Sequence, residues 1–231
     1  MQFDEKWAFV GKKEKRCEPA DPADARQGDH WDHVAFDSEH RLVISVVTGK
    51  RTSENTRELL QDFKRRTGGR LPRLITTDEY APYETAILAT YGQEVTPPPT
   101  GRRGRPRQPY QVPPPALTYA TVHKTRENGR VVNIDYRLIF GTALALAAAL
   151  LASQVSRAIN TAFVERHNGT DRNRNSRKVR KTYGFSKDWD VHQAVTYFTM
   201  YSYNFCWPVG RYERKGPTAA GVSAPRPWPS A

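Results

Sequence analysis

The sequence predicts an α/β fold in which helices flank a mixed β-sheet. Short β-rich runs over residues 2–10, 33–37 and 41–49 precede a helical segment and a further buried strand. The turn between the second and third runs is too short to join parallel strands, whereas a crossover helix makes the next strand parallel to a neighbour. A length of 231 residues suits one compact enzyme with an insertion.

The first half of the chain reads as an antiparallel meander followed by a helix and a strand. The run QFDEKWAFV opens the meander, and the turn DSEH joins HVAFD to RLVISVVTG. A helix is expected over residues 53–66, with Ser53 as N-cap and a glycine pair, Gly68 and Gly69, at its end. Residues 71–78 then predict a buried strand.

A change of composition marks an insertion after residue 91. The segment from Gly92 to about Pro115 is rich in proline and arginine and predicts a linker. Residues 118–141 predict a β-hairpin around Asn128-Gly129. The apolar run from Leu138 to Ala152 falls short of the ~20 residues that cross a bilayer, so we expect a core helix and no membrane.

Two helices are expected in the last part of the chain. The first spans about 158–178 and carries Glu165. The second begins after Ser186, and its apolar stripe is expected to face the core. That stripe comprises Val191, Val195, Phe198, Ser202 and Phe205.

The element order β-β-β-α-β-α, then an insertion, then α, matches the ribonuclease H-like fold. The predicted divisions are a first core part at 1–91, an insertion with linker, hairpin and apolar helix at 92–157, C-terminal core helices at 158–210, and a loose tail at 211–231.

Charge and cysteine content indicate a cytoplasmic partner of nucleic acid. The chain has 36 lysines and arginines against 24 acidic residues, a net charge of +12, which favours a polyanion. Its two cysteines, Cys17 and Cys206, form no CxxC pattern, which argues against a zinc site and a disulfide framework.

Three acids lie where a metal-dependent nuclease would need them. Phosphodiester chemistry with two Mg²⁺ ions requires about three carboxylates from neighbouring elements. Asp4 lies in the first strand, Asp78 ends the parallel strand, and Glu165 lies on a later helix. Glu5 and Glu79 are excluded, because neighbours in a strand point to opposite faces.

The segments around these acids resemble the DDE transposases of the insertion-sequence-one family. They are FDEKWAFVGKK at 3–13, TTDEYAPY at 76–83, and FVERHNGTDRNRNSRKVRKTYGFSKDWDVH at 163–192. With the strands between them, the resemblance covers roughly half the chain. It implies that Asp4, Asp78 and Glu165 are the catalytic metal ligands for Mg²⁺, with Mn²⁺ as a substitute.

The same resemblance implies a bacterial, DNA-associated enzyme that cleaves transposon ends and joins them to target DNA. The joining requires double-stranded DNA and a homodimer or larger synaptic assembly. The 87 positions from Asp78 to Glu165 exceed the family's usual spacing, which is why an insertion is expected. Members of the family usually carry a DNA-binding region before the first aspartate, whereas only three residues precede Asp4 here. A reading frame that begins here would lack recognition of the terminal repeats unless a companion reading frame or a frameshift supplies it.

Basic segments supply the predicted DNA contacts. GRRGRPR at 101–107 resembles an AT-hook core, suited to a narrow minor groove or to nonspecific phosphate binding. The run after Glu165 is predicted to contact phosphates. The predicted DNA-binding residues are Arg102, Arg103, Arg105, Arg107, Arg166, Asn168, Arg172, Arg177, Lys178, Arg180 and Lys181.

Two alternatives stay open at this point. A structure-selective nuclease of the same fold would cut DNA without joining it. A catalytically inert transposase remnant would bind DNA equally well with or without Mg²⁺.

Overall fold

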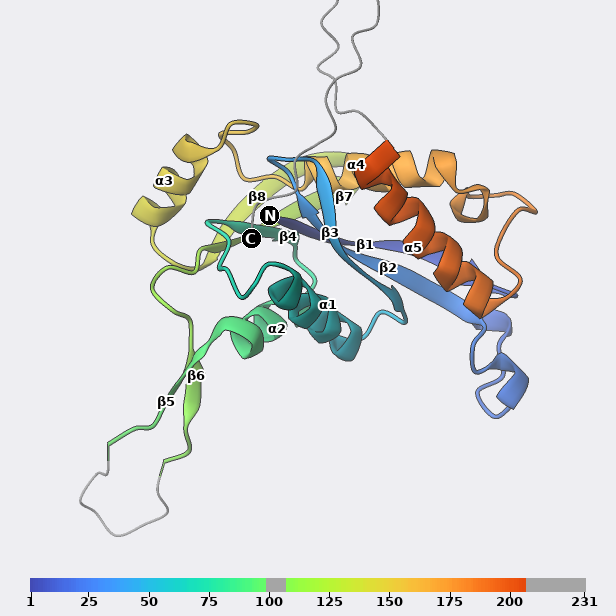
Figure 1. The fold of residues 1–231 in the computed structure, drawn as a ribbon, viewed down its shortest axis with the longest axis horizontal. Coiled ribbons are helices and arrows are strands. Elements are labelled where there is room, and N and C mark those ends of the chain that lie inside the picture. Colours follow the sequence, from blue (N-terminus) through green and yellow to red (C-terminus); the bar gives the residue numbers. More distant parts are fainter. Residues whose placement is uncertain (99–106, 207–231) are drawn as a thin grey trace, which may run out of the picture.

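The chain folds around one mixed six-stranded sheet, with helices on both faces (Figure 1). The computed structural model describes residues 1–98 and 107–206. The strand order is β3-β2-β1-β4-β7-β8. Strands β1 and β7 run parallel to β4, and the other neighbours are antiparallel. The predicted α/β fold with a mixed, helix-flanked sheet is therefore confirmed.

The predicted meander forms β1 (Gln2–Val10), β2 (Gly28–Asp37) and β3 (Leu42–Gly49). Strand β2 begins five residues before the predicted start at residue 33. Its first half, GDHWD, carries polar side chains that mask a strand pattern, yet Asp32 pairs opposite Lys6 of β1. Two short 3₁₀ helices, η1 (Glu14–Arg16) and η2 (Pro22–Asp24), fill the connection from β1 to β2.

Helices α1 (Ser53–Arg66) and α2 (Pro82–Tyr91) cover one face of the sheet. Thr52, not Ser53, is the N-cap of α1, because its side chain accepts the Asn55 N–H. Strand β4 (Ile75–Asp78) lies between the two helices in sequence and is shorter than predicted. The core of this face is apolar and fully enclosed; it includes Phe3, Leu59, Leu60, Phe63, Ile75, Tyr83, Ile87, Leu117 and Tyr119.

Helices α4 (Ala162–Arg174) and α5 (Trp189–Cys206) cover the opposite face. A second, smaller core lies beneath them, formed by Val34, Phe36, Val43, Val46, Val164 and Met200. A short 3₁₀ helix, η3 (Ser176–Lys178), follows α4. Asp188 begins α5 by accepting the Val191 N–H at 2.9 Å.

The predicted hairpin exists but does not belong to an insertion. Strands β7 (Tyr119–Glu127) and β8 (Arg130–Phe140) meet at Asn128 and Gly129, whose φ angles of 48° and 78° fit a two-residue turn. Strand β7 pairs in parallel with β4, so the hairpin completes the main sheet. Of the predicted insertion, the short ribbon β5 (Gln93–Val95) and β6 (Tyr110–Val112) forms a separate two-stranded sheet.

Two expectations about apolar segments are wrong. Helix α3 (Ala143–Ala152), predicted to lie in the core, has no buried residue. The stripe on α5 is also turned outward, because Val191, Phe198 and Phe205 are exposed while His192, Thr196 and Met200 form the buried face. None of the described helices is long and apolar enough to cross a membrane.

Candidate metal centre

Three carboxylates converge where β1 and β4 lie side by side. The parallel register sets Gln2 opposite Thr76, which brings Asp4 level with Asp78 at the end of β4. Carboxylate oxygens of Asp4, Glu5 and Asp78 lie within 4.8 Å of one another. Asp78 also accepts the Tyr80 N–H at 3.3 Å, so it ends the strand and opens the turn toward α2.

The inclusion of Glu5 corrects the sequence prediction. Alternation along a strand separates the Cβ atoms of Asp4 and Glu5, but it does not separate the ends of their side chains. Asp4 Oδ1 accepts the Glu5 N–H at 2.9 Å, so the Asp4 carboxylate lies close to the backbone of Glu5. Arg51 lies 3.0 Å from Glu5 Oε2 and stacks over Tyr80. The alternation of side chains along a strand therefore could not predict that Glu5 approaches Asp4 and Asp78.

Glu165 lines the same cleft as the three acids but stands apart from their cluster. Its Oε1 pairs with Lys124 of β7 and accepts the Thr161 hydroxyl at 2.5 Å. The structure therefore brings all three predicted ligands to one cleft, with Asp4 and Asp78 in direct proximity and Glu165 held by a lysine.

Hydrogen bonds and an ion pair connect helix α4 to β1 along the length of the helix, and these contacts set the position of Glu165. Gln2 Oε1 accepts the Phe163 and Val164 N–H groups at 3.1 and 2.9 Å.

Further along, Asn168 donates to Asp4 Oδ2 at 2.7 Å, and Arg172 donates to the Trp7 carbonyl at 3.2 Å. Lys6 pairs with Asp171 between these two contacts. Residues about one helical turn apart on α4 thus contact alternate residues of β1.

A buried ion-pair cluster lies beneath this contact. Asp32 lies 3.2 Å from Lys6 Nζ and 2.7 Å from Lys178 Nζ, and Lys178 also contacts His192 at 3.0 Å. Burial opposes ionisation of Asp32, but the two lysines hold its pKa well below the usual range. This cluster joins β1, β2, α4 and α5 beside the site.

Burial and mutual charge repulsion raise the pKa values of the clustered acids. Burial, followed by the charges of Asp78, Glu5 and Glu165, raises the pKa of Asp4 to about 7. Burial and Asp78 raise the pKa of Glu5 to about 7 as well. Anions held together at such a cost favour a cation between them.

The donor set fits a hard divalent cation. Carboxylate oxygens are the ligands that Mg²⁺ prefers. One buried oxygen at the site, Asn168 Oδ1, has no hydrogen-bond partner among the described residues, and the buried Tyr83 hydroxyl lies beside the Glu5 carboxylate. Together with the clustered carboxylates, the Asn168 oxygen forms a set of oxygen ligands that faces one point of the cleft, where Arg51 is the cation paired with Glu5.

The cleft around the acids has a basic rim. Its volume is about 700 Å³, and it is open to solvent. The basic side chains that line it are Lys6, Arg51, His123, Lys124, Arg126, Arg172 and Arg180. Glu79 is the other acid that strand alternation excluded as a metal ligand. It also lines the cleft, but it pairs with His123 and Arg137. A negatively charged ligand in this cleft therefore lies near cations as well as near the acidic centre.

The predicted DNA-binding residues divide into four groups. Arg172, Arg180 and Asn168 line the cleft. Arg166 and Lys181 are exposed outside it, Arg177 is half-buried, and Arg107 is exposed beside the β5–β6 ribbon. Arg102, Arg103 and Arg105 lie outside the described residues. Lys178 is buried against Asp32, so the prediction that it contacts phosphate is wrong.

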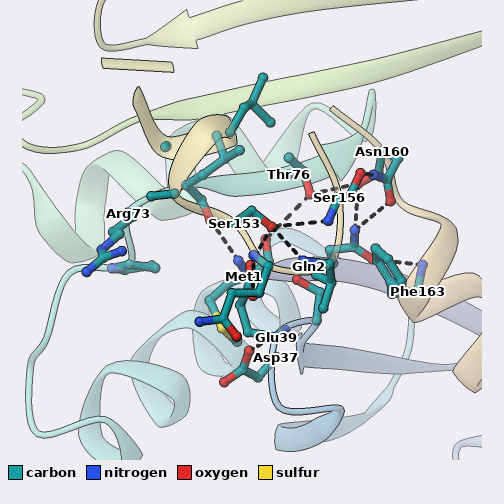
Figure 2. Close-up of a pocket in the computed structure, with 18 of the residues that line it drawn as sticks. Met1, Gln2, Asp37, Glu39, Arg73, Thr76, Ser153, Ser156, Asn160 and Phe163 are labelled. Atoms are coloured by element: carbon teal, nitrogen blue, oxygen red, sulfur yellow. Dashed lines mark hydrogen bonds between the residues drawn. The ribbon is translucent and has the colours of Figure 1, made fainter. Parts of the chain in front are cut away.

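A second cavity, of about 450 Å³, lies at the amino-terminal ends of β1 and β4 (Figure 2). Asn160 accepts from Gln2 and Thr76 here, which ties the loop before α4 to the sheet. Ser153 donates to Glu39 of the β2–β3 turn at 2.5 Å. None of the predicted site residues lines this cavity. The hydrogen bonds of its lining residues fix the loop that leads into α4.

Comparisons of the chain with protein-family models, with curated proteins and with solved structures find no match.

Proposed function

We propose that this chain is the catalytic domain of a DDE transposase with a ribonuclease H-like fold. The observation that carries the proposal is the meeting of Asp4, Glu5 and Asp78 in a basic cleft into which α4 brings Glu165. The strand order supports the fold assignment, since a meander continues through two parallel strands, β4 and β7. The resemblance around the acids, described above, supports the activity.

In this proposal, Asp4 and Asp78 would hold the divalent cations, with Glu165 as a further ligand. Glu5 is a fourth acid at the same centre, because its carboxylate lies with the other two. Bound Mg²⁺ ions would lower the pKa of the attacking water or 3′-hydroxyl and would stabilise the negative charge that develops around the phosphorus. No covalent protein intermediate is required.

The chain's own residues bind and orient the DNA. Lys124, Arg126, Arg172 and Arg180 line the cleft, and their charges would pair with phosphate oxygens. Asn168 holds the Asp4 carboxylate, and the docking of α4 fixes the direction of Glu165. The double-stranded transposon end and the target would lie along this basic rim.

A Mg²⁺-dependent strand-transfer assay with precleaved DNA ends tests the proposal. The wild-type chain is expected to join these ends to target DNA, and Asp78→Asn is expected to abolish the joined product. An Asp190→Asn variant, changed at an exposed acid of α5, controls for loss of charge.

Cleavage without joining would replace the proposal with a nuclease of the same fold. DNA binding that is equal with and without Mg²⁺, with neither reaction, would replace it with an inert remnant.

A further inference from the structure

The outer edge of β8 is unpaired, whereas the opposite edge of the sheet is protected. At that opposite edge, Asn204 of α5 accepts the Val43 N–H at 2.9 Å and donates to the Val43 carbonyl at 2.8 Å. No segment of the described chain pairs with the outer side of β8, which is eleven residues long. A long open edge is a template for another strand.

The side chains of β8 do little to discourage such pairing. The strand contains neither proline nor lysine, and its charged residues, Arg130, Asp135 and Arg137, carry both signs and so can pair across two antiparallel copies. Ile134 and Tyr136 are 44% and 52% exposed, and Val131 and Val132 are also exposed. The strand therefore presents apolar surface together with free backbone groups.

Helix α3 extends the same apolar surface. It follows β8 directly, after a turn at Gly141 with φ of 97°, and lies next to β8 outside the sheet (Figure 1). Its sequence, ALALAAALLA, has no charged side chain, and Leu144 and Leu151 are 81% and 69% exposed. A ten-residue helix is marginal alone, and one that is apolar all round is normally buried.

The chemistry of the surface favours a second copy of this chain as its partner. Helix α3 offers no cation to nucleic acid, and its length of ~15 Å is about half of a bilayer core. An antiparallel copy of β8 centred on Tyr136 places Asp135 opposite Arg137 twice, once in each direction. Arg137 also pairs with Glu79 of its own chain through Nη1, and its guanidinium has further N–H donors for the partner's Asp135. The same register places Ile134 opposite Leu138, so charges and apolar groups both match.

We propose that β8 and α3 form the surface on which two copies of this chain dimerise. The two β8 strands pair antiparallel across a two-fold axis at Tyr136, and each α3 packs against the partner. A strand of this length extends ~37 Å, long enough, with the helix, for the ~800 Å² per partner of a stable interface. The proposal does not depend on the catalytic one, because its readout is molecular mass.

Single cysteines test the register of the paired strands. In a background of Cys17→Ser and Cys206→Ser, Tyr136→Cys places two thiols directly opposite each other, and a short bismaleimide is expected to join them. Ile134→Cys is the matched control on the same face, because the two copies of residue 134 stand ~14 Å apart in this register. Cross-linking at 134 as efficient as at 136 would overturn the register.

Charges placed on α3 test the interface itself. Sedimentation equilibrium of the full chain is expected to show a dimer that Leu144→Glu with Leu151→Glu weakens at least ~100-fold, since burying unpaired carboxylates is costly. Both side chains are exposed in the monomer, so folding is expected to persist, as circular dichroism would show. Phe198→Glu, on the exposed face of α5, is the control and is expected to leave the dimer intact.

Two results would overturn the proposal. One is a wild-type chain that stays monomeric up to ~100 μM. The other is a dimer that survives the α3 substitutions but is lost in Phe198→Glu, which would place the interface on α5.

Discussion

Asn168 is the residue whose contact with the acidic centre is most direct. Because its amide holds Asp4 Oδ2, Asn168→Ala is expected to lower the affinity for Mn²⁺ about 10–100-fold, as loss of a supporting hydrogen bond does at metal sites. Calorimetric titration of Mn²⁺ measures this. Asn173→Ala, exposed on the same helix, is the control. Equal affinities in the two variants would show that Asn168 does not hold a metal ligand.

Asp32 is the residue on which the buried ion-pair cluster depends. Asp32→Asn leaves the ammonium groups of Lys6 and Lys178 buried with less negative charge beside them, which is expected to cost about 3–5 kcal/mol of unfolding free energy. Urea denaturation measures the loss. Removing an exposed pair with Asp190→Asn is expected to cost less than about 1 kcal/mol. Similar losses in both variants would contradict the buried cluster's role.

Single residues also mark the limit of what the sequence predicts about the site. Asp4 and Asp78 could be predicted, because their strands could be located and a flanking motif singled them out. Glu5 could not, since its approach depends on how two side chains bend. Lys178 sits in a basic run whose pattern is the same whether a lysine faces DNA or a buried aspartate.

At the scale of elements, local sequence patterns predicted the helices and strands well, but they predicted poorly which strands pair and which surfaces the helices pack against. The helix over 53–66 and the turn at Asn128-Gly129 follow from capping and turn residues close in sequence. The parallel pairing of β7 with β4 joins Ile75 to Tyr119, and no local pattern encodes such a distant contact. The apolar composition of α3 predicted burial, but composition does not say which molecule supplies the covering surface.

The docking of α4 on β1 gives a prediction for a whole element. Gln2→Met retains the approximate shape of residue 2 but removes the acceptor for two N–H groups at the start of α4. Hydrogen exchange of the first amides of α4 is expected to speed up about 10-fold, equivalent to ~1.4 kcal/mol of local stability. Gln61→Met, exposed on α1, is the control. Unchanged exchange would mean that Gln2 does not secure the helix.

Three of the four histidines buried in the described part of the chain, His30, His33 and His192, are predicted to weaken the fold in acid. Burial lowers the pKa of His30 to about 4 and that of His192 to about 3, and it lowers the pKa of His33 as well. Between pH 6.5 and 4 these histidines bind more protons in the unfolded chain than in the folded chain, so their contribution to stability falls as pH falls. Asp4 and Glu5, whose folded pKa values are about 7, contribute in the opposite direction over the same window. Asp32, whose folded pKa is depressed, adds its loss only below about pH 4.

Urea denaturation at several pH values tests this. The comparison of the wild type with His192→Gln isolates one histidine, because the acids contribute equally to both. From pH 7 to 4.5 the wild type is expected to lose roughly 2–3 kcal/mol of unfolding free energy relative to His192→Gln. A difference that does not change with pH would contradict the buried, neutral state of His192.

The acidic centre predicts that a divalent cation reverses the stability order of two variants. Without metal, Asp78→Asn removes a negative charge that raises the pKa of both Asp4 and Glu5, so this variant is expected to melt higher than the wild type. With Mn²⁺ at 100 times its dissociation constant, the wild type gains about 2.7 kcal/mol. For a chain of this length that is a rise of roughly 5–10 °C.

Asp78→Asn is expected to gain little, so that the order of melting temperatures inverts. Thermal unfolding in a chelator and in Mn²⁺ measures the melting temperatures under the two conditions. The control Asp190→Asn is expected to follow the wild type in each. A variant that melts lower than the wild type under both conditions would assign Asp78 a structural role, because a carboxylate that only supports the fold loses the same contacts whether or not a cation is present.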